Sequence, residues 1–180
     1  MPVSYIKAPM DVMEVLSEVL CKHDDYQPIL AAKVTFDVLM AYAPLDATGA
    51  PTGPAIKHNG IAAVALASKT SLIERVSGCA DCRILIDAAW WTREGRTHEQ
   101  RMALLDHELY HFEVVLDKDA LVRDSAKRPK IDIRKHDVEF GWFRQVARRN
   151  GANSIECTQA SELLENDCQT FWPEILGARL

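Results

Sequence analysis

The stretch THEQRMALLDHELYH, residues 97–111, decides the fold of this 180-residue chain. Its apolar side chains recur at helical spacing, and the periodic pattern continues to about Leu116, where we expect the helix to end. Thr97, with Gln100 three residues later, forms the capping-box pattern that marks the beginning of a helix. The sequence therefore predicts a well-capped helix that begins at residue 98.

Within this helix, His107-Glu-Leu-Tyr-His111 is an HExxH motif. Residues four apart lie one turn above each other, so both imidazoles project from one face and can bind the same ion. Zinc in such a site is an electrophile and lowers the pKa of a water towards ~7. Glu108 is placed to accept the proton of that water during attack on a carbonyl carbon, and to pass it to the leaving amine. We predict Zn²⁺ as the cofactor, His107 and His111 as ligands, and Glu108 as the catalytic base.

A catalytic zinc site needs a third protein ligand and an open fourth position. His136 follows the motif by 25 residues, at the beginning of a helix that we expect over residues 137–150. Glu139 lies one turn further along that predicted helix. Asp117 has the spacing of the longer HExxHxxGxxH/D motif, but Val114 occupies the position of the glycine that breaks the helix there. His136 is the preferred third ligand, and Glu139 is the next candidate.

Helices and short strands alternate along the rest of the chain. Apolar periodicity, prolines and glycines predict further helices at residues 10–22, 25–42, 69–76 and 158–171. The same signals predict strands at residues 61–67, 83–91 and 131–133, separated by loops at residues 44–60 and 117–130. This mixture predicts an α+β fold for a single domain over residues 1–180, with its core at about 60–151 and helical flanks at both ends.

The overall composition is that of an ordinary globular protein. Apolar residues make up 48% and charged residues 26%, which excludes intrinsic disorder and a coiled coil as the main state. The sequence begins without a secretory signal and has no 18-residue apolar run, so we expect a cytoplasmic protein with no membrane partner. Cys79 and Cys82 form a lone CxxC, which we interpret as two incidental thiols rather than half a zinc knuckle or a redox pair.

The charge is distributed unevenly. A net charge of −5 argues against a dedicated nucleic-acid binder. Residues 123–149 nevertheless contain nine Lys or Arg and four Asp or Glu, a local net charge of +5. Such a segment can attract nucleic acid or an acidic partner, but it is more often a solvated face, and we favour the solvated face.

Two motifs resemble the putative phage metallopeptidase family. Its members combine an "ALLxHELxH" helix, matched by ALLDHELYH at residues 103–111, with a downstream "HDVEEF" helix, matched in part by HDVEF at residues 136–140. They also have a strand that ends in tryptophan before the metal-binding helix, which Arg83–Trp91 matches. The resemblance implies a zincin-like fold, in which a small mixed sheet packs against several helices, one of them the HExxH helix. It also implies the ligand set His107, His111 and His136.

The resemblance also suggests where a substrate would bind. In zincins the strand before the metal-binding helix forms an edge along which an extended peptide pairs, so by analogy Ile84–Ala89 would bind the substrate. An interior or edge strand that binds no substrate is an equally favoured alternative. Trp90 and Trp91 would wall that cleft or pack in the core, with the core favoured for at least one of them. A group that stabilises the developing oxyanion does not stand out: His98, Tyr110 and several arginines are all candidates.

We therefore expect a zinc-dependent metallopeptidase that acts on a peptide or protein substrate, encoded by a phage or prophage. One alternative is a zincin-fold binding or inhibitory protein that acts on a host factor without turnover. Another is a protease similar to the SprT-like enzymes, which act on DNA-bound proteins. The chain shares with those enzymes only HExxH and a downstream histidine.

Overall fold

A computed structural model of the chain describes residues 2–58, 60–118, 120–136 and 143–166. The helices are α1 (Met10–Lys22), α2 (Gln27–Ala31), α3 (Leu72–Val76), α4 (Ala88–Thr92), α5 (His98–Tyr110), α6 (Arg144–Asn150) and α7 (Ile155–Asn166). The strands are β1 (Ser4–Lys7), β2 (Phe36–Tyr42), β3 (Ile56–His58), β4 (Ile61–Ala63), β5 (Ala65–Lys69), β6 (Cys82–Asp87), β7 (Phe112–Val114), β8 (Leu116–Asp117), β9 (Ala120–Leu121) and β10 (Ile131–Ile133). Single 3-10 turns cover Asp24–Tyr26 and Gly151–Asn153.

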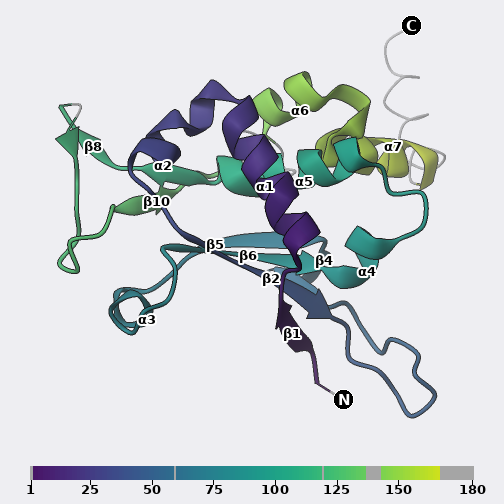
Figure 1. The fold of residues 1–180 in the computed structure, drawn as a ribbon. Coiled ribbons are helices and arrows are strands. Elements are labelled where there is room, and N and C mark those ends of the chain that lie inside the picture. Colours follow the sequence, from purple (N-terminus) through teal and green to yellow (C-terminus); the bar gives the residue numbers. More distant parts are fainter. Residues whose placement is uncertain (1, 59, 119, 137–142, 167–180) are drawn as a thin grey trace, which may run out of the picture.

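A small mixed sheet forms one layer of this α+β fold. Its strand order is β1-β2-β6-β5, with β2 and β6 parallel and the two outer pairs antiparallel. Helices α1, α2, α5, α6 and α7 lie together over one face of this sheet (Figure 1). Three short antiparallel pairs, β3–β4, β7–β10 and β8–β9, extend from the two layers.

The core fills the space between the helices and the sheet. Helix α1 has apolar residues at helical spacing, and five of them are buried: Val12, Val15, Leu16, Val19 and Leu20. Because side chains of a strand alternate between faces, Ile84 and Ile86 of β6 both point into this core, where each is fully buried. Leu105 and Leu109 of α5 pack in the same cluster, so α5 is held between α1 and the sheet.

Several predicted elements are confirmed and two predicted helices are wrong in part. The helix at 10–22, the capping box at Thr97 and the strand at 131–133 form as expected. The expected helix at 25–42 is limited to the 3-10 turn and α2, because its second half forms β2. In Phe36–Tyr42 the buried residues Val38 and Met40 lie on one face with the less buried Leu39 between them, Ala41 is buried on the other face, and the stretch pairs in parallel with β6.

Helix α5 is shorter than predicted. It ends at Tyr110, and Phe112–Val114 instead pairs with Ile131–Ile133 in an antiparallel ladder. The apolar residues that continued the helical pattern are therefore strand residues. The loop predicted at 117–130 contains the two-residue strands β8 and β9. Residues 137–142, where the next helix was expected to begin, lie outside the described residues, and α6 begins at Arg144.

The strand predicted at 83–91 ends early. The Asp87 carboxylate accepts hydrogen bonds from the backbone N–H groups of Ala89 (2.8 Å) and Trp90 (3.3 Å), which caps α4. Trp91 is buried in the core, as expected for one of the pair. Trp90 lies under the guanidinium of Arg96, 4.0 Å from the ring centroid.

Two further features concern membrane-spanning helices and the cysteines. None of the helices within the described residues is both long and apolar enough to cross a membrane. Cys79 and Cys82 are free thiols rather than a disulfide, and Cys82 is fully buried in β6. Burial raises the pKa of the Cys82 thiol, so it stays protonated and unreactive.

Candidate metal centre

The last turn of α5 carries the two histidines of the HExxH motif. His107 is buried within the helix, and His111 is the residue at which the helix ends. The β7–β10 ladder then brings a distant segment beside them. Beyond its last pair, the Arg134 N–H donates to the His111 carbonyl (2.7 Å), and the His111 Nδ1–H donates to the Arg134 carbonyl (2.9 Å). These bonds deliver His136, two residues later, to the same place.

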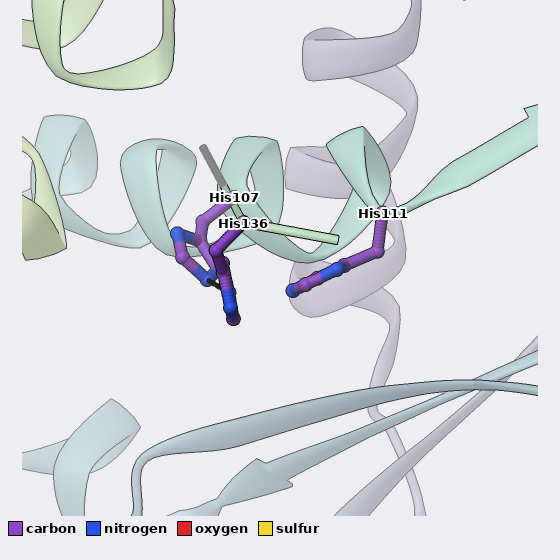
Figure 2. A group of neighbouring side chains, drawn as sticks. All are labelled: His107, His111 and His136. Atoms are coloured by element: carbon purple, nitrogen blue, oxygen red, sulfur yellow. Dashed lines mark hydrogen bonds between the residues drawn. The ribbon is translucent and has the colours of Figure 1, made fainter. Parts of the chain in front are cut away.

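The three imidazoles converge. Each of His107, His111 and His136 offers a ring nitrogen, and these atoms all lie within 4.8 Å of one another. The Nε2 atoms of His107 and His136 are 3.3 Å apart. Figure 2 shows His107 and His136 side by side, with the ring of His111 directed towards them. The structure therefore brings together three residues that the sequence singled out as ligands.

The hydrogen bonds of two rings leave the correct atoms for a metal. A carbonyl oxygen can only accept, so the proton of His111 is on Nδ1 and its Nε2 has a free lone pair. His107 Nδ1 lies 2.7 Å from the Glu156 carboxylate, which also only accepts. Both Nε2 atoms are thus free to act as ligands, and three neutral imidazoles are a donor set that zinc accepts. The residues present fit a metal ion.

The other two candidates for third ligand do not join the cluster. Asp117 is exposed in β8 and is not one of the residues whose ligand atoms lie close together. Glu139 lies outside the described residues.

Glu108 lies next to the cluster and is buried. Its carboxylate is 4% exposed and accepts a hydrogen bond from the backbone N–H of Ala67 in β5. Burial raises the pKa of Glu108 to about 7, although the charge of His107 and the Ala67 N–H act in the opposite direction. The catalytic-base candidate is therefore tied to the sheet as well as to α5.

Burial and nearby charges also shift the pKa values of His107 and His111, in opposite directions. Burial and, to a smaller extent, the charges of the neighbouring histidines lower the pKa of His111 to about 4, although its hydrogen bond to the Arg134 backbone acts in the opposite direction. Burial on its own lowers the pKa of His107 too, but its hydrogen bond with Glu156 and the nearby carboxylates outweigh burial, so the net pKa is raised.

A cavity of about 540 Å³ opens beside the histidines. One wall is α5, with His107, Glu108 and His111. The opposite wall is the β3–β4 hairpin together with β5, which is rich in alanine, and the segment after β10 closes a third side. The site is therefore a cleft between a helix and a strand rather than a sealed core cluster.

The strand expected to pair with a substrate is not at an edge. Ile84–Ala89 falls largely in β6, which lies between β2 and β5 and has both of its edges occupied. Of the two alternatives, substrate pairing along this strand is therefore wrong, and an interior strand is what the structure has. The edge strand beside the cleft is β5, which precedes β6 in the chain and pairs with it. The order of strands in a sheet depends on long-range pairing, which apolar patterns do not encode.

A sequence model of the family described as "Putative phage metallopeptidase" matches residues 4–167. The chain belongs to this family. The match extends on both sides of residues 60–151, the expected core of the domain. No curated protein and no solved structure matches the chain. Membership of a metallopeptidase family, together with the histidine cluster, implies a metal cofactor and a peptide or protein substrate.

Two residues of this candidate site were missed in the sequence. Glu156 in α7 is 2% exposed, and its Oε1 accepts from the His107 imidazole (2.7 Å) and from the backbone N–H of Phe143 (3.3 Å). The Phe143 ring is fully buried and lies 5.1, 4.6 and 4.8 Å from the rings of His107, His111 and His136. A single acidic residue and a single phenylalanine, 49 and 36 residues from His107, have no spacing that marks them as partners.

Two arginines of the basic segment 123–149 pair with buried carboxylates of the fold. The Arg128 guanidinium pairs with the buried Asp81 at 2.8 Å. Arg149 pairs with Asp106 at 2.5 Å and with Asp25 at 2.7 Å. These two arginines stabilise the fold, so the preferred interpretation of a solvated face does not describe them.

Proposed function

We propose that this protein is a zinc-dependent metallopeptidase with a zincin-like domain, in which His107, His111 and His136 hold the ion and Glu108 is the general base. The observation that carries the proposal is the arrangement of the cleft. Three imidazole ligands and a buried carboxylate line one cavity, and the facing wall includes an edge strand. Burial of a carboxylate is costly, so its presence beside three histidines supports a role in the reaction.

The chain's own residues divide the reaction between them. Zinc, when bound, supplies Lewis acidity that polarises a carbonyl and makes water acidic near neutral pH. Glu108 takes a proton from the attacking water and then delivers it to the amine nitrogen as the peptide bond breaks. The Ala67 N–H holds the carboxylate of Glu108 in place during both transfers.

Strand β5 is the element that we expect to align the substrate. The Asp87 N–H donates to the Val64 carbonyl (2.9 Å), so by antiparallel alternation the backbone polar groups of Ala65, Ala67 and Lys69 point away from β6. The Ala67 N–H is used by Glu108, so this edge lies beside the proposed base, and its other outward groups are the ones that we expect to pair with a peptide. An extended peptide that pairs with β5 would pass both Glu108 and the histidines.

The test of the reaction is Glu108→Gln, assayed with fluorescently labelled casein. We expect the zinc-loaded variant to lose at least about 100-fold in cleavage rate, because a general base typically contributes 10²–10⁴-fold. Its zinc content should equal that of the wild type, since the ligands are intact. Glu14→Gln, at an exposed position of α1, is the matched control and should cleave normally. Equal activity of Glu108→Gln and wild type would show that Glu108 is not the base.

The test of the ligand set is the metal content of the purified protein. We expect about one zinc per chain in the wild type and loss of most of it in His136→Ala. Glu139→Ala is the comparison, because Glu139 was the competing third ligand. Loss of zinc only in Glu139→Ala would replace His136 by Glu139 in the site.

A further inference from the structure

The cleft needs a hydrogen-bond donor for the carbonyl oxygen of a substrate, and the residues first considered do not supply it. His98 lies at the beginning of α5, where its Nε2 is 2.9 Å from the Glu18 carboxylate, and it does not line the cavity. Tyr110 does not line the cavity either, because its ring packs against Phe143. Arg134 lines it, but its guanidinium lies over the Tyr110 ring, 4.1 Å from the centroid.

His58 is in a different position. It is the last residue of β3, pairs with Ile61 of β4, and is followed by Asn59-Gly60, a dipeptide that favours a tight hairpin turn. Gly60 has φ +84°, a conformation that suits glycine in such a turn. His58 therefore lies at the end of the β3–β4 hairpin, where it lines the same cavity as Glu108 and the proposed ligands.

The imidazole of His58 is available to a substrate. It is exposed, and among the described residues it makes no hydrogen bond or ion pair. It also lies outside the group whose nitrogens are within 4.8 Å of one another, so it is not a fourth ligand. A histidine in the cleft that neither binds the proposed ion nor bonds to the protein can face the open position where the substrate lies.

The place of His58 differs from that of the other basic side chains in the cleft. Lys135, like Arg134, also lines the cavity. Its position directly before His136 in the chain places it on the ligand side of the cleft, whereas His58 is on the hairpin that faces α5.

We propose that His58 is a catalytic residue that donates a hydrogen bond from its imidazole N–H to the carbonyl oxygen of the scissile peptide bond. The role rests on the proposed peptidase function. As the oxygen of water bonds to the carbonyl carbon, the carbonyl π electrons move to the carbonyl oxygen, and Glu108 takes the proton released by the water. His58 stabilises the negative charge on that oxygen without giving up its proton. When the carbonyl re-forms, the carbon–nitrogen bond breaks and the amine takes the proton from Glu108.

The experiment compares His58→Ala with wild type on a quenched peptide built from a site that the wild type cleaves in labelled casein. Removal of one donor to an oxyanion costs about 10²–10³-fold in kcat, so we expect a fall of about 100-fold with KM nearly unchanged. Zinc content should stay the same. A phosphinic peptide of the same sequence, a tetrahedral mimic, should bind zinc-loaded His58→Ala more weakly by a similar factor, measured by calorimetry.

Two variants serve as controls. Lys57→Ala changes the exposed neighbour of His58 on the same strand, which does not line the cavity, and it should match the wild type. Lys135→Ala tests a second basic side chain of the cleft, and its kcat should fall far less than that of His58→Ala. Unchanged kcat and unchanged phosphinate binding in His58→Ala would overturn the role of His58 while leaving the peptidase proposal in place. If the zinc-loaded wild type cleaves nothing, the proposed function and this role both fail.

Discussion

At the scale of single residues, the candidate centre depends on which nitrogen of each imidazole carries the proton. The Arg134 carbonyl holds the His111 proton on Nδ1, and Glu156 does the same for His107. Each bond therefore turns an Nε2 lone pair towards the cluster. Phe143 packs against all three rings and limits their rotation. The arrangement of the ligands is thus determined by partners that do not themselves bind an ion.

The first prediction concerns Glu156. We expect Glu156→Ala to weaken zinc binding by about 10–100-fold, because His107 would lose the acceptor that orients its ring. Glu156→Gln keeps an acceptor but not the charge, so its zinc affinity should lie between those of Glu156→Ala and the wild type. Competition with a chromophoric chelator gives the affinities, and circular dichroism checks that the variants are folded.

The control for Glu156 is Glu162→Ala, an exposed position on the same helix α7, which should bind zinc as the wild type does. A Glu156→Ala protein that is folded and binds zinc with wild-type affinity would show that the His107–Glu156 bond does not support the site.

At the scale of elements, α5 positions most of the site, and its two ends have separate tasks. The N-terminal end is held by the capping box, in which the Thr97 hydroxyl accepts from the Gln100 N–H (3.2 Å) and the Gln100 side chain accepts from the Thr97 N–H (3.2 Å). The C-terminal end carries His107 and Glu108. The residues between these ends are almost all buried.

The second prediction follows from this division. We expect Thr97→Ala to lower the free energy of unfolding by about 0.5–2 kcal/mol, the usual cost of losing an N-cap side chain. Zinc content should not change, because the ligands lie more than two turns away. Urea unfolding gives the stability, and Glu94→Ala, in the exposed loop before the helix, is the control. A stability change below the error of the control would mean that the cap does not hold the helix end.

The helices and strands also show which elements can be predicted from apolar patterns and which cannot. Helix α1 and the start of α5 could be predicted because their signals, an apolar stripe and a cap, involve residues within one or two turns. The stretch Phe36–Tyr42 was mistaken for a helix because a short apolar run fits both periods, and only its pairing with β6 selects the strand. The end of α5 was misplaced for the same reason, since β10 competes for Phe112–Val114.

At the scale of the whole molecule, two buried ion networks join segments that are distant in the chain. Asp106, on the face of α5 behind the site, binds Arg149 and the Tyr26 hydroxyl. These bonds join three segments: α5, α6 and the 3-10 turn that precedes α2. Asp81 binds Arg75 of α3 at 2.7 Å and Arg128 of the loop before β10 at 2.8 Å. Each carboxylate is 1–2% exposed, so its charge requires these partners.

The third prediction is the pH dependence that Asp81 confers. Burial on its own raises the pKa of Asp81, but hydrogen bonds from Thr35, Arg128 and Arg75 outweigh burial and hold the pKa below its usual value. A folded pKa below the unfolded value of about 3.9 means that ionised Asp81 stabilises the fold at neutral pH. That stabilisation is lost as the pH falls from about 4 through the folded pKa.

The measurement is urea unfolding of the wild type and of Asp81→Asn over a series of pH values. Near pH 6 we expect Asp81→Asn to be less stable by about 3–5 kcal/mol, the usual cost of breaking a buried ion pair. The difference should shrink as the pH is lowered below about 4, because the wild-type carboxylate is then protonated as well. A difference that stays constant down to pH 2 would contradict the prediction.

The sequence by itself determined the HExxH helix, its cap and the α+β class, because each depends on contacts between residues a few positions apart. Only the tertiary structure decided the rest of the site. His136 meets His107 across 29 residues and Glu156 meets it across 49, through bonds that exist once β7 pairs with β10 and α7 packs on α5. The edge position of β5 and the place of His58 in the cleft likewise follow from strand order. Strand order and helix docking result from the burial of apolar surface by the whole chain, which no single stretch of residues encodes.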